Sequence, residues 1–394
     1  SEVIMSTLKV DAIRHNSATS DAITTAADGT CTAKLTSVGG GQLSHRNIII
    51  NGAMNVAQYG TSASNTGDVS ARCVDRFFAS NPSASAVQTF SQETDAPAGF
   101  YNSAKATCTT ALASYGTNAQ SKIEYRIEGT DLAHVQLGTS NAQTLSVSFY
   151  VKSNKTGNTA IGLLNQDNNR SFVHQYTIAS ANTWQRVSFK VVGDTTGTWF
   201  KNTGIGMRMR WGTFGTDYQT GTFDAWQAGQ KMGTSNSPIN FNSATGDYIQ
   251  ITGVQVELGD TATSFEHRSF TEELTRCYRY YRRFGANGAL PTPGAYNRFS
   301  IGYSPSSSDV RFPFQLDPPM RITPVNSNFS KSGSFSIQPG SIGSYSLTCD
   351  DASCSPNMMI ALMGNTSVSS GSGSAVSLHA NNDTSAYIDI SAEL

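Results

Sequence analysis

The stretch Leu145-Ser146-Val147-Ser148-Phe149-Tyr150-Val151 decides the fold class, because apolar side chains return at every second position. Successive side chains of a β-strand point to opposite faces of the sheet, so this pattern predicts a strand with one face in a core. The same period recurs at 122–128, 186–191 and 205–211. Several such strands separated by turn residues predict an antiparallel β-sandwich, of jelly-roll type, over residues 47–268.

The stretch Tyr248–Leu258 also has the pattern of a strand, but its apolar positions change phase. They are odd-numbered up to Ile251 and even-numbered from Val254 onward, with Gly253 at the change. One extra residue in a strand produces such a shift, so the sequence predicts a β-bulge at Gly253.

Composition narrows the function classes. Among 394 residues, charged side chains make up 14% and the formal net charge is −1, whereas nucleic-acid binding needs a field of Lys and Arg. The longest apolar run, Met358–Met363, is far shorter than the ~20 residues of a membrane span. The first residues lack the features of a signal peptide. We therefore expect a protein made in a cytoplasm, neither embedded in a membrane nor bound to nucleic acid.

The cysteines do not predict a metal site. The six are Cys31, Cys73, Cys108, Cys277, Cys349 and Cys354. None forms a C-x-x-C pair and no His follows at zinc spacing, so we expect no metal and no cofactor. Cys349 and Cys354 could close a short loop, but a cytoplasmic origin favours reduced thiols.

The first 46 residues contain no Phe, Tyr or Trp. Such a segment cannot bury enough apolar surface to fold alone. We interpret residues 1–46 as a thin shaft in which three copies share one narrow core, and as the segment that attaches to a larger assembly. The alternative is a flexible leader.

A helix interrupts the β pattern. Ser269-Phe270-Thr271-Glu272 fits a capping box, and the sequence predicts a helix over 269–285. Its apolar positions have spacings of four, three, four and three, typical of a coiled-coil seam: Phe270, Leu274, Cys277, Tyr281 and Phe284. We expect three such helices around one axis, and hence a homotrimer; the alternative is a connector packed on the sandwich. Residues 286–394, rich in Ser and Gly, predict a C-terminal β domain.

No motif of an enzyme occurs. The sequence lacks a G-x-S-x-G elbow, an H-E-x-x-H pair and a P-loop. Glu124, Glu128 and Asp131 lie close enough to be weighed as glycosidase carboxylates. A solvated strand face shared with Lys122 and Arg126 explains the glutamates better, so we predict no catalytic residue and no enzyme.

Aromatic side chains in loops are the remaining candidates for chemistry, because aromatic rings stack on the apolar faces of sugars. Trp199, Tyr218 and Trp226 fall in turn-like stretches and are the predicted carbohydrate contacts, with ordinary loop anchoring as the alternative. Trp184 and Trp211 are assigned to the core.

Several short segments of the sequence form a recognisable set of motifs. They are Leu8–Ile13, Asn47–Thr61, Val74–Phe77, Gly253–Gly259, Thr263–Ser269, Glu272–Leu274 and Cys277–Tyr281. Together they resemble tail fibre or spike-like proteins of marine tailed phages, particularly those that infect cyanobacteria. The stretches Thr144–Lys152 and Trp184–Val191 also look like a carbohydrate-binding jelly roll.

The resemblance implies a virion part in the phage tail. It implies a homotrimer attached through its N-terminus to other tail proteins, facing a host surface polysaccharide or outer-membrane component. Two alternatives stay open: a non-adhesive virion component, such as a tail adaptor or a capsid or vertex decoration protein, and a depolymerase.

Overall fold

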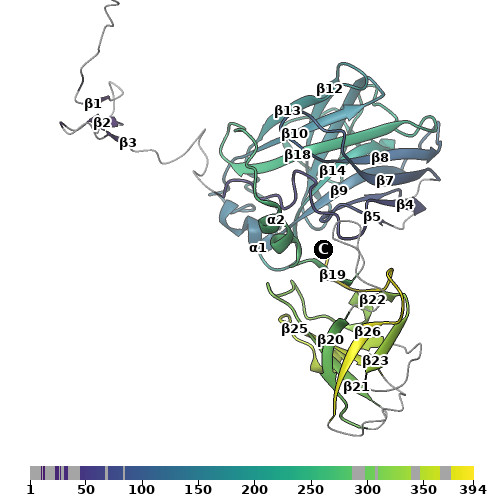
Figure 1. Ribbon diagram of the computed structural model, residues 1–394. Helices are drawn as coiled ribbons and strands as arrows, with labels where there is room; N and C mark the ends of the chain where they lie inside the picture. Colours follow the sequence, from purple (N-terminus) through teal and green to yellow (C-terminus); the bar gives the residue numbers. More distant parts are fainter. Residues whose placement is uncertain are drawn as a thin grey trace, which may run out of the picture.

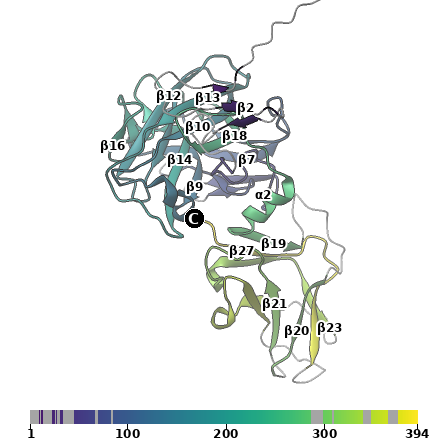
Figure 2. The ribbon, with the colours of Figure 1, turned by 90° about the vertical axis from the view of Figure 1, so that its left-hand side faces the viewer.

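Among the described residues, the regular secondary structure is almost all antiparallel β-strand, which confirms the predicted all-β class. The structure is a computed structural model. It describes residues 10, 12–13, 23–25, 27, 31–33, 45–66, 70–82, 85–285, 298–306, 309–338, 347–363 and 374–394. Figures 1 and 2 show a β-sandwich joined at one end to a smaller β-rich body. Neither α-helix of the described part has the length or the hydropathy to span a membrane.

The sandwich consists of two facing sheets. The six-stranded sheet has the order β13 (Gln185–Val191), β10 (Leu145–Ser153), β18 (Tyr248–Leu258), β8 (Ser103–Thr110), β7 (Val87–Glu93) and β4 (Ser62–Thr66). The seven-stranded sheet has the order β16 (Trp226–Ala228), β12 (Arg170–Ile178), β11 (Gly157–Leu164), β14 (Ile205–Phe214), β9 (Gln120–Glu128), β6 (Phe77–Ser80) and β5 (Ala71–Arg72). All their strand pairs are antiparallel.

The core lies between these sheets, where the alternation in the sequence placed it. Phe149 on β10 is completely buried, and its ring lies 5.6 Å from that of Trp211 and 5.5 Å from that of Tyr176 in the opposite sheet. Burying a side chain of this size contributes roughly 1.5–3 kcal/mol. The predicted core position of Trp211 is therefore confirmed.

The predicted bulge is present at Gly253. Its φ is +60°, and the register between β10 and β18 shifts at this point. A Cβ added to Gly253 would lie 2.7 Å from Cζ of Phe100. Glycine is required here both by the left-handed backbone and by the close approach of that ring.

The helix is shorter than the sequence predicted. The α2 helix (Phe270–Cys277) begins at the capping box, where the Glu272 amide donates to Ser269 Oγ at 3.2 Å, and ends after eight residues. Tyr281 and Phe284 lie instead in strand β19 (Tyr281–Gly285). The coiled-coil helix over 269–285 is therefore wrong, because the backbone of 281–285 pairs with strand β27 (Tyr387–Ser391).

The predicted seam residues consequently have different environments. Cys277 is buried in its own chain against Ile50, Val56 and Tyr280, and Leu274 packs at the edge of that cluster. Phe270 is 42% exposed. No observation tests the homotrimer, which stays a prediction.

The C-terminal body has two sheets of its own. The first is β19, β27 and β22 (Phe329–Ser332); the second has the order β23 (Phe335–Gln338), β26 (Ala375–Ala380), β20 (Arg298–Tyr303), β21 (Val310–Gln315), β25 (Met358–Met363) and β24 (Leu347–Cys349). Cys349 and Cys354 are free thiols in this body, with sulfur atoms 3.3 Å apart.

Short elements complete the described part. They are β1 (Ala12–Ile13), β2 (Ile23–Thr25), β3 (Cys31–Ala33), α1 (Gly129–Leu132), η1 (Ala133–Val135), β15 (Gln219–Thr220), β17 (Gly233–Thr234) and the 3-10 turns η2 (Thr216–Tyr218), η3 (Asn326–Asn328) and η4 (Asp351–Ser353). The first three pair as a small antiparallel sheet. Most of the predicted shaft, residues 1–46, lies outside the described residues.

Candidate functional site

Two of the three predicted carbohydrate contacts lie together. Trp199 is 8% exposed, and its indole nitrogen donates to Asp194 Oδ2 and to the Thr196 carbonyl, both at 3.2 Å. Its ring packs edge-on against Trp226 at 5.1 Å, and the Trp226 indole donates to the Val192 carbonyl at 2.6 Å. Both indole nitrogens thus hold the segment that contains Val192, Asp194 and Thr196 in place.

Tyr218 lies elsewhere. It is half-buried and packs against a small cluster formed by Leu164, Phe214 and Met232. The three predicted residues therefore do not form one platform. Their contact with a carbohydrate stays a prediction, and their geometry gives each a packing role.

Trp184 was assigned to the core, and this is wrong. Val187, Phe189 and Val191 face the core, so the even-numbered positions along this edge face outward. Trp184 is half-buried on the outer face of the six-stranded sheet, where its indole donates to Asp95 Oδ1 at 3.3 Å.

A cluster of aromatic side chains lies on the same outer face. Phe100 is at its centre, with ring centroids 5.4 Å from Tyr150, 5.0 Å from Phe265 and 5.1 Å from His267. These rings line a pocket of about 440 Å³, which we call the outer-face pocket. Its lining is Ala98, Gly99, Phe100, Tyr150, Arg186, Ala262, Thr263, Ser264, Phe265 and His267.

The sheet and two loops position the rings. Tyr150 projects outward from β10 because its neighbours Phe149 and Val151 face the core. Phe100 comes from the loop between β7 and β8, and Phe265 and His267 come from the segment that follows β18. Sequence reasoning missed this site because the four rings come from three separate parts of the chain.

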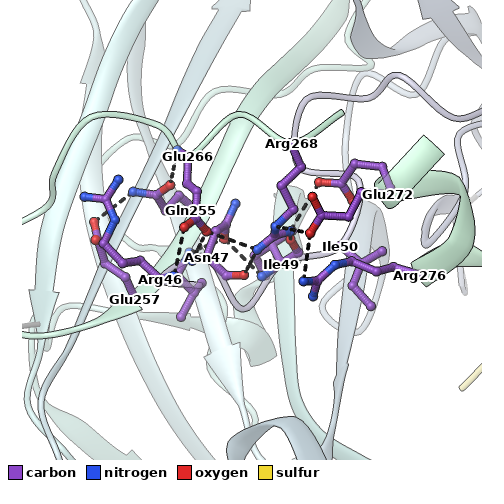
Figure 3. A network of polar contacts seen from close by, with 12 residues as sticks. Arg46, Asn47, Ile49, Ile50, Gln255, Glu257, Glu266, Arg268, Glu272 and Arg276 are labelled. Carbon is purple, nitrogen blue, oxygen red and sulfur yellow. Dashed lines mark hydrogen bonds and ion pairs between the residues drawn. The ribbon is translucent and has the colours of Figure 1, made fainter. Parts of the chain in front are cut away.

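A polar network fixes the segment that carries Phe265 and His267 (Figure 3). The intervening Glu266 accepts hydrogen bonds from the backbone amides of Arg46 and Asn47, at 3.1 and 2.9 Å. Arg268 donates to the Ile49 carbonyl at 3.1 Å and pairs with Glu266 at 3.2 Å. Alternate side chains thus hold the segment to the sandwich while the aromatic ones face the pocket.

The electrostatics of the network agree with this anchoring role. Burial would raise the pKa of Glu266, but the backbone amides of Asn47 and Arg46 and the charge of Arg268 outweigh it and lower the pKa. Glu266 is therefore ionised at neutral pH.

The predicted solvated face at Glu124 is in fact buried. Glu124 Oε1 lies 2.6 Å from Arg126 Nε and 3.0 Å from Arg208 Nη1. Its Oε2 lies 2.9 Å from Arg210 Nε and 3.2 Å from Lys122 Nζ. Burial would raise the pKa of Glu124, but these cations, Arg210 foremost, hold it well below its usual value. One carboxylate shared by four cations is a structural cluster and a poor proton donor.

A second cavity lies at the junction of the two bodies. It has a volume of about 560 Å³ and is lined by α1, α2, residues 45–50 and the pair Pro318–Pro319. Asp131 lines it, and burial together with the charge of Glu128 raises the pKa of Asp131. Glu128 itself is held by Arg279 at 2.7 Å and by the Tyr280 hydroxyl at 2.6 Å. The only Phe, Tyr or Trp in this lining, Tyr280, is buried.

Comparison with known proteins finds no matching family model and no curated protein similar in sequence. Among solved structures, the chain is similar to the enzymatically active domain of Bacteriophage CBA120 tailspike protein 4, with 13% identity and a TM-score of 0.30 over 54% of this chain. The similarity spans 21% of that tailspike chain.

Carbohydrate-binding modules are also among the similar structures. A CBM4 structure has 12% identity and a TM-score of 0.27, over 53% of this chain and 97% of its own. The CBM22-1–CBM22-2 tandem of Paenibacillus barcinonensis Xyn10C has 7% identity and a TM-score of 0.28, over 91% of this chain and 98% of its own. At these values the likenesses assign neither a function nor a site.

Proposed function

We propose that this chain is a non-enzymatic adhesive protein of a phage virion, a homotrimeric tail fibre or spike. In this proposal the outer-face pocket binds a glycan of the host surface, and the N-terminal segment attaches to other tail proteins. The sequence phrases at Asn47–Thr61 and Gly253–Gly259 support the virion assignment.

The aromatic cluster in the outer-face pocket carries the glycan assignment. Sugar rings present apolar C–H faces that pack against aromatic rings, and their hydroxyls need polar partners at the rim. Phe100, Tyr150 and Phe265 supply the rings, while Arg186 and Thr263 supply polar groups. A trimer would present three pockets at once, so that weak single-site binding gains avidity.

Affinity electrophoresis tests the proposal. The full chain is run through gels that contain capsular or lipopolysaccharide glycans from candidate hosts, beside Phe265→Ala and Tyr150→Ala. Tyr303→Ala is the matched control, because Tyr303 is an aromatic residue, 47% exposed, in the C-terminal body. We expect retardation of the wild type and the control and its loss in both pocket variants. Equal retardation of all four chains would refute the pocket as the glycan site.

A further inference from the structure

The outer-face pocket contains a guanidinium that is fixed in position. Arg186 lies on β13 directly opposite Tyr150 on β10. Its Nη2 donates to the Thr263 carbonyl at 2.7 Å, which tethers the group to the loop on the other side of the pocket. Arg186 is nevertheless exposed. The guanidinium therefore stands at the wall of an aromatic pocket, facing solvent.

This cation has no carboxylate partner among the described residues. The lining of the pocket contains no Asp or Glu, and no carboxylate of the described chain lies within ion-pair distance of Arg186. By contrast, Arg170 on the other sheet is paired with Asp194 at 2.6 Å.

Of the acidic side chains nearest along the chain, three already have partners, and the fourth, the exposed Asp260, accepts within the described chain only from the Thr261 hydroxyl at 3.1 Å. Asp95 is paired with Lys152 at 2.7 Å. Glu257 accepts from the Thr263 hydroxyl at 2.8 Å, and Glu266 is held by Arg268. None of the four forms an ion pair with Arg186, so its guanidinium is left without a paired carboxylate.

We infer that the outer-face pocket selects an acidic sugar residue, with Arg186 pairing its carboxylate. The inference rests on the proposed glycan-binding function of the same pocket. A guanidinium matches the planar carboxylate of a uronic acid with two parallel hydrogen bonds. The adjacent rings of Tyr150 and Phe100 give the pyranose ring an apolar surface. A neutral sugar would pack against the aromatic rings but would offer no carboxylate to pair with Arg186.

The experiment uses a panel of polyuronates: alginate, polygalacturonate and hyaluronan. Each is compared with its own carboxyl-reduced form, in which the carboxylates have become alcohols, by affinity electrophoresis of the full chain. Dextran sulfate is included to separate carboxylate recognition from attraction to any negative charge. We expect at least one polyuronate to bind ten-fold or more tightly than its reduced form and than dextran sulfate.

Variants of Arg186 test whether this residue causes the preference for a carboxylated polymer. Arg186→Gln is expected to bring binding of the polyuronate down to that of its reduced form, and Arg186→Lys to restore only part, because a lysine cannot pair bidentately. Lys190→Gln is the matched control, since Lys190 is an exposed cation on the same strand and face but outside the pocket lining. It should leave binding unchanged.

The outcomes separate the inference from the proposed function. Equal binding of the native and reduced polymers, abolished by Phe265→Ala, overturns the acidic-sugar inference and leaves glycan binding intact. Binding of no polyuronate, or a preference that survives Arg186→Gln, also overturns it. Equal, Arg186-dependent binding of dextran sulfate would show that the pocket recognises charge and not a carboxylate.

Discussion

Arg76 and Glu393, 317 positions apart in the sequence, form a buried ion pair that joins the sandwich to the C-terminal body. The two side chains are 2% and 6% exposed. The Arg76 guanidinium also lies 3.5 Å from the ring centroid of Tyr280 and donates to the Arg126 carbonyl at 2.7 Å. The last residues of the chain lie at this joint (Figure 1).

Removing one partner of this pair should destabilise the chain strongly. Glu393→Ala leaves a buried guanidinium without its carboxylate, which costs about 3–5 kcal/mol of unfolding free energy. Urea unfolding measures the loss. Asp260→Ala, at an exposed carboxylate, is the control and should change the unfolding free energy by less than about 0.5 kcal/mol. Equal midpoints for the two variants would show that the pair contributes no measurable stability.

Asp75 should make stability fall as pH rises. Burial raises its pKa to about 7, although hydrogen bonds from the Gln58 side chain and amide oppose the shift. The folded carboxyl thus holds its proton more tightly than the unfolded one, whose pKa is about 3.9. Its contribution to stability is full below about pH 4 and is lost as pH rises to about 7.

Asp75→Asn tests this account. The substitution removes the titrating group. Both Asp75 oxygens accept from Gln58, one from its backbone amide and one from Nε2. The new amide can therefore donate to Gln58 Oε1, a buried atom without a partner in the described chain, only after the Gln58 amide turns over, and that change does not depend on pH. We expect the variant to gain in melting temperature relative to wild type as pH rises from 4 to 7, and the difference to level off above that. A difference independent of pH would contradict the raised pKa.

Gly253→Ala should damage both the fold and the pocket. The left-handed backbone strains any side chain, by about 1–3 kcal/mol, and the new Cβ would also displace Phe100 from the aromatic cluster. We expect weaker glycan retardation in the gel assay. Gly246→Ala is the control, because Gly246 has φ +90° but nothing within 4 Å of the added Cβ. Gly246→Ala should lose stability and keep glycan binding. Loss of binding in both variants would show that destabilisation, and not the displacement of Phe100, weakens binding.

The homotrimer can be tested at Phe270, the predicted seam residue that is exposed and could contact another copy of the chain. Phe270 is exposed at the start of α2, whereas Cys277 and Tyr281 are buried in their own chain. Light scattering of the full chain should give a mass near three times 42.0 kDa. Phe270→Asp should weaken the association with little effect on the folded chain. A monomeric wild type would refute the trimer.

The sequence predicted those features that depend on local periodicity. The alternation around Phe149 identified a strand and its core face, and the change of phase identified the bulge at Gly253. The capping box at Ser269 identified the start of α2. Each of these follows from side-chain direction along one element.

Features that depend on distant partners were missed. The sequence could not show that residues 281–285 leave the helix, because the strand that captures them, β27, lies about a hundred residues later. The burial of Glu124 depends on Arg208 and Arg210 of another strand. The outer-face pocket likewise depends on two loops meeting over Tyr150, which no spacing in the sequence reveals.

The decisive measurement of where the glycan binds is a crystal structure of the chain with an oligosaccharide cut from a retained polysaccharide. We expect a sugar ring in the outer-face pocket, against Phe100 and Phe265, with its polar substituents toward Arg186. An oligosaccharide bound at Trp199 and Trp226, in the junction cavity or on the C-terminal body, with the outer-face pocket empty, would contradict it.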